Sequence, residues 1–178
     1  MDIKNYRKTF ISNKGGSMKT PKEFMKNINN KIITDDMLEA ALFSLNKRAK
    51  NMRDMQRKYA HKYDKYNNEG KYKSQKENYY KKKEFLLRLL TPVCAHIETV
   101  PHGRTEKKLY YLFYRLGKHS FHRPIPSHTL ETKYPDLEIK TVDLDTYGED
   151  INDLISNQFI DKLIYIIKKG DYQYVRND

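Results

Sequence analysis

Five histidines lie close together in the middle of this chain, where imidazole groups could bind a metal ion. His96, His102, His119, His122 and His128 fall within 33 residues. Imidazole nitrogen is a common ligand of Zn²⁺, although such a site needs three or four ligands. We expect His119 and His122, which are three residues apart across a turn and a short strand, to point to a common side. They are candidate metal ligands, but the pattern as a whole favours ordinary histidines on a sheet face, and no cofactor is predicted.

The tripeptide Glu138-Ile139-Lys140 is a candidate for catalysis. An acidic residue followed two positions later by lysine on a strand resembles the PD-(D/E)xK nucleases, in which the acid binds a divalent metal and the lysine steadies the attacking water. This chemistry also needs a carboxylate from the preceding strand, whereas Asp136 lies on the same expected strand as Glu138. Metal-dependent cleavage by Glu138 and Lys140 is therefore an alternative hypothesis, and the leading hypothesis assigns no catalytic residue.

Basic and aromatic residues are concentrated between residues 47 and 83. Cationic side chains on a stiff rod can meet phosphates spaced along a nucleic acid, and tyrosine rings can stack on unpaired bases. The same side chains could instead bind an acidic protein surface, or the tyrosines could pack within the rod itself. The candidate contact residues are Lys47, Arg48, Lys50, Arg53, Arg57, Lys58, Lys62, Lys65, Lys81, Lys82, Lys83, Tyr59, Tyr63 and Tyr66.

Helices are expected to position these residues. Thr20 and Thr34 each begin a pattern typical of a helix start, with proline or acidic residues following them. Apolar and aromatic residues then recur at steps of four and three over 38–66, which predicts one long helix. Residues 67–70 should end it, and a second helical pattern covers 71–90. Together they predict an antiparallel hairpin with arms of about 48 Å and 30 Å.

The second half of the chain changes to alternation of apolar and polar residues, which predicts strands. The expected strands cover residues 93–100, 109–114, 120–122 and 137–142. An amphipathic helix should follow, with Asp150 as its cap and Gly170 as its end. The order of helices, a small antiparallel sheet and a helix predicts an α+β fold.

The excess of positive charge lies in the first half of the chain. The formal net charge is +12, to which residues 1–31 contribute +6, residues 32–44 −3, residues 45–88 +10 and residues 89–178 −1. Within the second half, residues 131–161 hold nine acidic and two basic residues. Such asymmetry is typical of a segment that faces a polyanion, carried on a nearly neutral body.

Several classes of protein are excluded by composition. Cys94 is the only cysteine, which excludes a disulfide scaffold and a cysteine-based zinc site. No apolar stretch is long enough to span a membrane, and the first twenty residues lack the apolar segment of a secretory signal, so we expect a cytoplasmic protein without a membrane partner. Lysine outnumbers arginine by 26 to 9, as in AT-rich genomes, which suggests a low-GC bacterium or its phage.

Three regions follow from these patterns. Residues 1–19 form a flexible basic tail, and residues 20–178 form a single α+β domain. Within that domain, a basic helical hairpin (about 35–90) projects from a sheet-plus-helix body (about 91–178).

The leading functional prediction is a non-enzymatic accessory protein, from a phage or mobile element, that binds DNA or RNA or associates with a nucleoprotein complex. In a phage-encoded protein this would occur in the host cytoplasm. One alternative is a protein-interaction module, such as a counter-defence inhibitor, whose basic hairpin occupies the nucleic-acid site of a host enzyme. The second alternative is the nuclease described above.

Overall fold

The computed structural model describes residues 20–60, 63–144 and 154–176. The predicted tail of residues 1–19, the contact candidate Lys62 and the predicted helix cap Asp150 lie outside these ranges. The described chain forms two compact units. A helical unit contains the residues up to Leu86 and those from Leu154 onward, and a sheet unit runs from Leu87 to Leu144.

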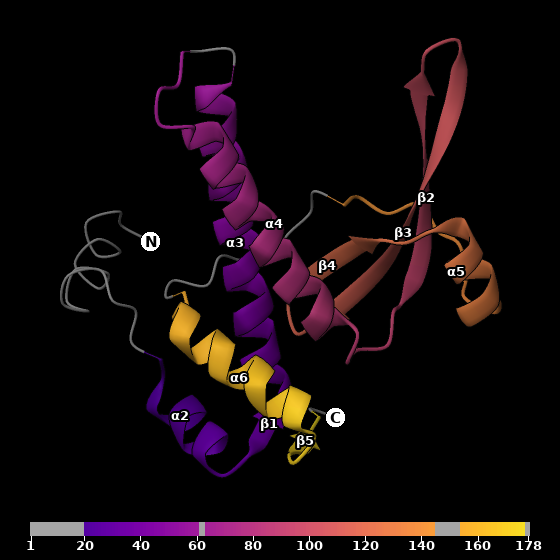
Figure 1. The fold of residues 1–178 in the computed structure, drawn as a ribbon. Helices are drawn as coiled ribbons and strands as arrows, with labels where there is room; N and C mark the ends of the chain where they lie inside the picture. Colours follow the sequence, from indigo (N-terminus) through magenta and orange to yellow (C-terminus); the bar gives the residue numbers. More distant parts are fainter. Residues whose placement is uncertain (1–19, 61–62, 145–153, 177–178) are drawn as a thin grey trace. The chain divides into compact units, whose positions relative to one another are not determined.

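The fold is α+β, as predicted, with a long helix pair and a small antiparallel sheet (Figure 1). Its helices, within the described residues, are α2 (Lys22–Asn29), α3 (Asp35–Tyr59), α4 (Asn68–Leu87), α5 (Ser127–Lys133) and α6 (Asn157–Lys169). Its strands are β1 (Ile32–Thr34), β2 (Cys94–His102), β3 (Thr105–Leu116), β4 (His119–Pro124) and β5 (Gln173–Val175).

Helix α3 begins where the sequence predicts. The Thr34 hydroxyl accepts a hydrogen bond from the Met37 N–H at 3.4 Å, which satisfies one of the unpaired donors of the first turn. The first half of α3 lies in the core of the helical unit, where Leu38, Leu42 and Leu45 are fully buried. The second half carries the charged residues of the hairpin.

Helices α3 and α4 form the predicted antiparallel hairpin, side by side in Figure 1. Tyr59 stacks on Tyr72 with ring centroids 5.8 Å apart, and Lys76 Nζ donates to Gln56 Oε1 at 2.8 Å. The prediction that the first arm extends to residue 66 is wrong. Ala60 is already extended (ψ 143°), so α3 spans 25 residues, or about 37 Å.

The start of α4 also differs from the prediction, because residues 68–70 open the helix instead of breaking it. Asp64 accepts a hydrogen bond from the Glu69 N–H at 2.8 Å, and the N–H groups of Asn68 and Glu69 lower the pKa of the Asp64 carboxyl. Asn67 takes the left-handed conformation (φ 51°) just before the first turn. A Cβ at Gly70 would lie 2.6 Å from the Asn67 side-chain amide nitrogen, so a larger residue here would displace that side chain.

Helix α6 begins later than predicted and belongs to the helical unit. Its cap is Ser156, whose hydroxyl accepts from the Phe159 N–H at 3.2 Å. Phe159 and Leu163 are buried, and Phe159 stacks on Phe24 of α2 with centroids 6.1 Å apart. The predicted stop at Gly170 is confirmed, since this glycine takes the left-handed conformation (φ 76°) of a helix end. This placement differs from the expected grouping of the last helix with the sheet.

The helical unit also contains two three-residue strands that no sequence pattern indicated. Strand β1 lies between α2 and α3, and β5 follows α6. Strands β1 and β5 pair in parallel, with Ile33 opposite Tyr174. Lys31 Nζ donates to Asp171 at 2.6 Å, and the Tyr174 hydroxyl donates to the Asp35 carboxylate. Burial is the main cause that raises the pKa of Tyr174.

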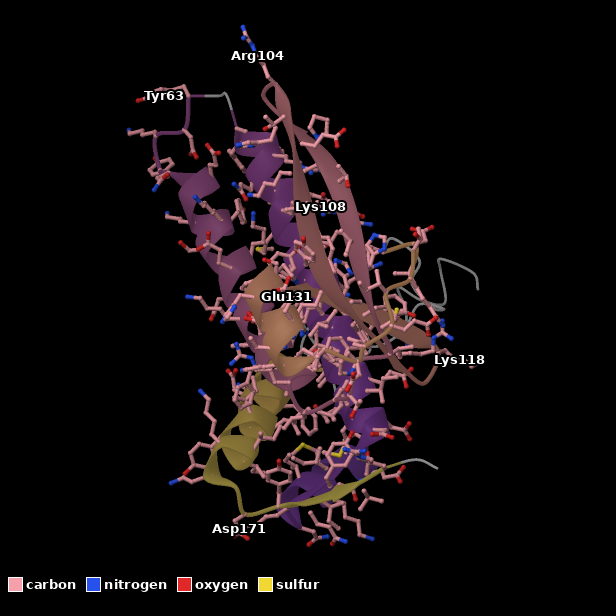
Figure 2. The ribbon with its side chains drawn as sticks, turned by 90° about the vertical axis from the view of Figure 1, so that its right-hand side faces the viewer. Tyr63, Arg104, Lys108, Lys118, Glu131 and Asp171 are labelled. Atoms are coloured by element: carbon pink, nitrogen blue, oxygen red, sulfur yellow. The ribbon has the colours of Figure 1, made fainter. Side chains whose placement is uncertain are left out.

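The sheet unit is built on an antiparallel sheet with the order β2-β3-β4. Gly103 and Gly117 take positive φ angles (61° and 59°) in the two tight turns. Strands β2 and β3 stay paired as far as His102 and Thr105, beyond the part of β3 that pairs with β4. Figure 2 shows Arg104 at the tip of this two-stranded extension.

The predicted strand at 137–142 is reduced to a single parallel bridge between Ile139 and Ala95. The Ala95 N–H donates to Glu138 O, and the Lys140 N–H donates to Ala95 O, both at 2.9 Å. The next donor, the Val142 N–H, bonds to the His96 side chain instead of the backbone of β2, so the ladder stops there. Within the described residues, no helix combines the length and the apolar character needed to cross a membrane.

Candidate functional site

The hairpin presents exposed cations on both arms and in the loop between them. Lys50, Arg57 and Lys58 of α3 are exposed, as is Lys65 in the loop. On α4, Lys71, Lys73 and Lys81 are exposed as well. Few carboxylates lie among these seven side chains, so they give this segment the positive electrostatic potential that the sequence predicts.

Other predicted contact residues are drawn partly into the protein. Lys47, Arg48 and Arg53 are half-buried, and burial lowers the pKa of the Arg48 guanidinium. Arg48 Nη1 and Arg53 Nε are buried without a hydrogen-bond partner among the described residues. These residues are therefore less accessible to a ligand than the sequence predicts.

Lys83 is not at the surface at all. Only 5% of this residue is exposed, and its Nζ lies 5.9 Å from the centroid of the Tyr80 ring. Burial lowers the pKa of Lys83 to about 8, because the charged amine loses its hydration. The prediction that Lys83 contacts a ligand from the surface is therefore wrong. Its neighbour Lys82 is partly exposed and forms an ion pair with Asp161 at 2.8 Å.

The three candidate tyrosines divide into two groups. Tyr59 is half-buried against Tyr72 within the hairpin, so its ring already has a stacking partner. Tyr63 and Tyr66 lie in the loop and are 93% and 67% exposed. Figure 2 shows Tyr63 at the free end of the loop, directed away from the two helices. The two loop tyrosines are therefore accessible to a ligand, whereas Tyr59 packs within the hairpin.

A groove that the sequence analysis did not identify lies between α4 and α6. It has a volume of about 500 Å³. Each helix contributes four residues at positions i, i+3, i+4 and i+7, which lie on one face of a helix. This spacing is the sequence pattern from which the two lining faces could have been predicted. The lining residues are Asn78, Lys81, Lys82 and Phe85 from α4, and Asp161, Ile164, Tyr165 and Lys168 from α6.

The candidate metal ligands His119 and His122 do not share a side, so that expectation is wrong. Both lie on β4, where residues an odd number apart face opposite sides of the sheet. His119 is buried and stacks on Phe121, whereas the His122 ring meets the edge of Tyr111 at 5.6 Å between centroids. Within residues 20–60, 63–144 and 154–176, no cluster of three His, Cys, Asp or Glu residues could hold a metal ion.

A polar pocket of about 630 Å³ lies beside β2 in the sheet unit, lined by His96, Glu98, Tyr111, His122 and Asp143 among others. His96 is buried, and both of its ring nitrogens are engaged. Nδ1 lies 3.2 Å from the Val142 nitrogen and 3.3 Å from the Lys140 carbonyl oxygen, and Nε2 lies 3.2 Å from Glu98 Oε1. With no nitrogen left for a substrate, His96 positions the segment around Val142.

Glu138 and Lys140 lie at the exposed outer edge of the sheet unit. Lys140 Nζ is 3.4 Å from the Glu138 carboxylate, so the two side chains pair with each other. Asp136, the carboxylate two residues before Glu138, is exposed on the same segment. Comparison with protein-family models, curated proteins and solved structures finds no match to this chain.

Proposed function

We propose that this protein binds nucleic acid through the helical hairpin, as a non-enzymatic accessory protein of a phage or mobile element. The observation that carries the proposal is the set of exposed cations on both hairpin arms, with two exposed tyrosines in the loop that joins them. An interaction of this kind draws its affinity from phosphate neutralisation.

The arrangement of charge on the hairpin supports phosphates as the ligand. Exposed Arg57 and Lys58 lie in the last turn of α3, and exposed Lys71 and Lys73 lie near the start of α4. The stacked tyrosines and the Lys76–Gln56 hydrogen bond hold the two arms together, which limits the entropy lost when a ligand binds. Lys65 Nζ lies 5.7 Å from the Tyr66 ring, so a cation and an exposed aromatic ring occur together at the loop.

The test is binding of fluorescently labelled DNA and RNA, single-stranded and duplex, measured by anisotropy across a salt series. We expect affinity to fall steeply with salt, by about 0.9 log units per log unit of salt for each phosphate contacted in a duplex and about 0.7 in a single strand. A variant with Lys58, Lys65 and Lys71 changed to glutamate should lose most of the binding and most of the salt dependence.

A matched variant controls for net charge. Lys22, Lys133 and Lys162 are exposed lysines outside the hairpin, and changing them to glutamate alters the total charge by the same amount. This variant should keep most of its affinity. Absence of binding at low salt, or equal losses in the two triple variants, would contradict the proposal. Retention of an acidic protein partner by the wild type without nucleic-acid binding would instead favour the protein-interaction alternative.

A further inference from the structure

We propose that the groove between α4 and α6 holds a segment of single-stranded nucleic acid. Tyr165 stacks on a base of this strand, and Lys81 and Lys168 bind its phosphates. The inference rests on the proposed function and adds to it a second contact site and a preference for strands whose bases are unpaired.

The two helices run in the same direction along the groove. Tyr79 lies beside Asn157, with 3.5 Å between the hydroxyl and the amide nitrogen, and Lys82 bonds Asp161 at 2.8 Å. One helical turn further on, Lys168 Nζ lies 5.5 Å from the Phe85 ring centroid. These contacts between the two helices extend along about two turns of α4, or roughly 10 Å.

The floor and the sides of the groove have different chemistry. Ile164 is buried and Phe85 is half-buried, so the floor is apolar. Lys81 of α4 and Lys168 of α6 are exposed, and the Lys168 ammonium reaches over the Phe85 ring. Lys82 is paired with Asp161. Two cations, one from each helix, therefore adjoin an apolar floor, an arrangement complementary to a flat ring flanked by phosphates.

Tyr165 supplies the stacking surface. Helix α6 buries its opposite face in the core, yet Tyr165 is 61% exposed. Lys169 Nζ lies 5.3 Å from the Tyr165 ring centroid, and the same ring lines the groove. A base of a duplex is covered by its neighbours and cannot reach such a ring, whereas an unpaired base can.

The occupant is a strand, because the groove is open at the surface and adjoins the basic hairpin on α4. Lys81 lines the groove and is also one of the exposed cations of the hairpin, so the groove and the hairpin surface share this residue. An acidic peptide would satisfy the lysines but would leave the exposed tyrosine ring without a stacking partner.

The test measures anisotropy of a labelled oligo(dT) or oligo(rU) strand and of a duplex of equal length. Tyr165→Leu should weaken single-strand binding roughly five- to hundredfold, the range measured for one base–aromatic stack, with little change for the duplex. Tyr165→Phe keeps the ring and should bind like the wild type. Lys168→Gln should lower the salt slope for single strands by about 0.7, whereas Lys162→Gln, on the same helix outside the groove, should change it less.

A further variant, a competitor and a crosslinking experiment test the groove independently. Asp161→Asn removes the acid of the groove and releases Lys82, so it should raise single-strand affinity several-fold. Poly-glutamate as competitor reports charge without bases, and Tyr165→Leu should leave its binding unchanged. Photocrosslinking of a bromouracil-substituted strand should label the peptide that contains Tyr165.

The outcomes separate this inference from the proposed function. If the hairpin triple variant loses binding while Tyr165→Leu and Lys168→Gln match the wild type, the groove is not the site and the hairpin proposal stands. Equal weakening of single-strand and poly-glutamate binding by Tyr165→Leu also overturns the inference, in favour of an acidic peptide. If no nucleic acid binds the wild type at low salt, both proposals fail.

Discussion

Tyr59 at the end of α3 stacks on Tyr72 of α4, with ring centroids 5.8 Å apart and ring planes 23° apart. The contact joins the arms of the hairpin one helical turn from the exposed loop that carries Tyr63 and Tyr66. Three tyrosines of similar spacing in the sequence thus have different environments, and one of them is structural. This stack, together with the Lys76–Gln56 hydrogen bond, joins the two arms of the proposed binding surface.

Removing either ring should loosen the hairpin. Aromatic pairs contribute about 0.5–1.5 kcal/mol beyond their area burial. We therefore expect a double-mutant cycle of Tyr59→Ala and Tyr72→Ala, measured by urea unfolding, to give a coupling free energy in that range. Tyr63→Ala serves as the control, because an exposed loop residue should change the unfolding free energy by less than about 0.5 kcal/mol. Additive effects at Tyr59 and Tyr72 would show that the stack contributes nothing.

Ser44 should be essential for the stability of the helical unit. Its buried hydroxyl donates to Ala40 O at 2.7 Å and accepts from the Ile155 N–H at 2.9 Å, which ties the chain before α6 to α3. Ser44→Ala leaves the Ile155 N–H buried without a partner, at a cost of about 1–3 kcal/mol in unfolding free energy. Ser74→Ala, at an exposed position of α4, should be neutral or slightly stabilising. Similar stability of the two variants would argue against the role of Ser44.

Lys83 should make the free energy of unfolding vary with pH in the alkaline range. Burial lowers its pKa to about 8 from the usual lysine value of 10.5, so below pH 8 the folded protein holds a charge that burial disfavours. The unfolded chain binds more protons than the folded protein between these values, so unfolding free energy should rise as pH rises through this window. Lys83→Met avoids the penalty and should be more stable at pH 7 by on the order of 3 kcal/mol.

The comparison of the two proteins across pH isolates this group. The difference in unfolding free energy between Lys83→Met and the wild type should be constant below pH 8 and shrink as pH rises toward 10.5. A difference that does not vary with pH would show that Lys83 titrates normally in the folded protein.

His96 should hold the segment around Val142 against β2. Its Nδ1 hydrogen-bonds the backbone around Val142, and its Nε2 hydrogen-bonds the Glu98 carboxylate, so the ring links β2 to this segment. His96→Ala should speed hydrogen exchange at Val142, while His128→Ala, an exposed histidine of α5, should leave that rate unchanged. Equal exchange in the wild type and His96→Ala would contradict this role.

Glu138 pairs with Lys140 at an exposed edge, so removing the Glu138 carboxylate should not change cleavage of nucleic acid. We expect plasmid incubated with Mg²⁺ or Mn²⁺ to behave the same with the wild type and with Glu138→Ala. Cleavage by the wild type that disappears in Glu138→Ala would revive the nuclease hypothesis, because a contaminating nuclease would act equally in both samples.

Local signals in the sequence predicted much of the fold. Thr34 followed by acidic residues marks the start of α3, and Gly170 marks the end of α6, because a helix terminus needs a cap or a left-handed residue nearby in the chain. Alternating residues predicted β2 and β3, since alternation reports which side chains face a core. Net charge likewise showed that the basic excess belongs to the first half of the chain.

Contacts between residues far apart in the chain decided the rest. Strands β1 and β5 are three residues long and separated by about 140 positions, so no local pattern can report their pairing. Lys83 has the same residue type and sequence surroundings as Lys81 and Lys82, yet packing buries only Lys83. The α4–α6 groove exists because two helices with the same i, i+3, i+4, i+7 spacing meet face to face. The sequence by itself determined where charge and helices occur, and only the tertiary structure decided which of those charges face solvent, because burial depends on what the rest of the chain places against each side chain.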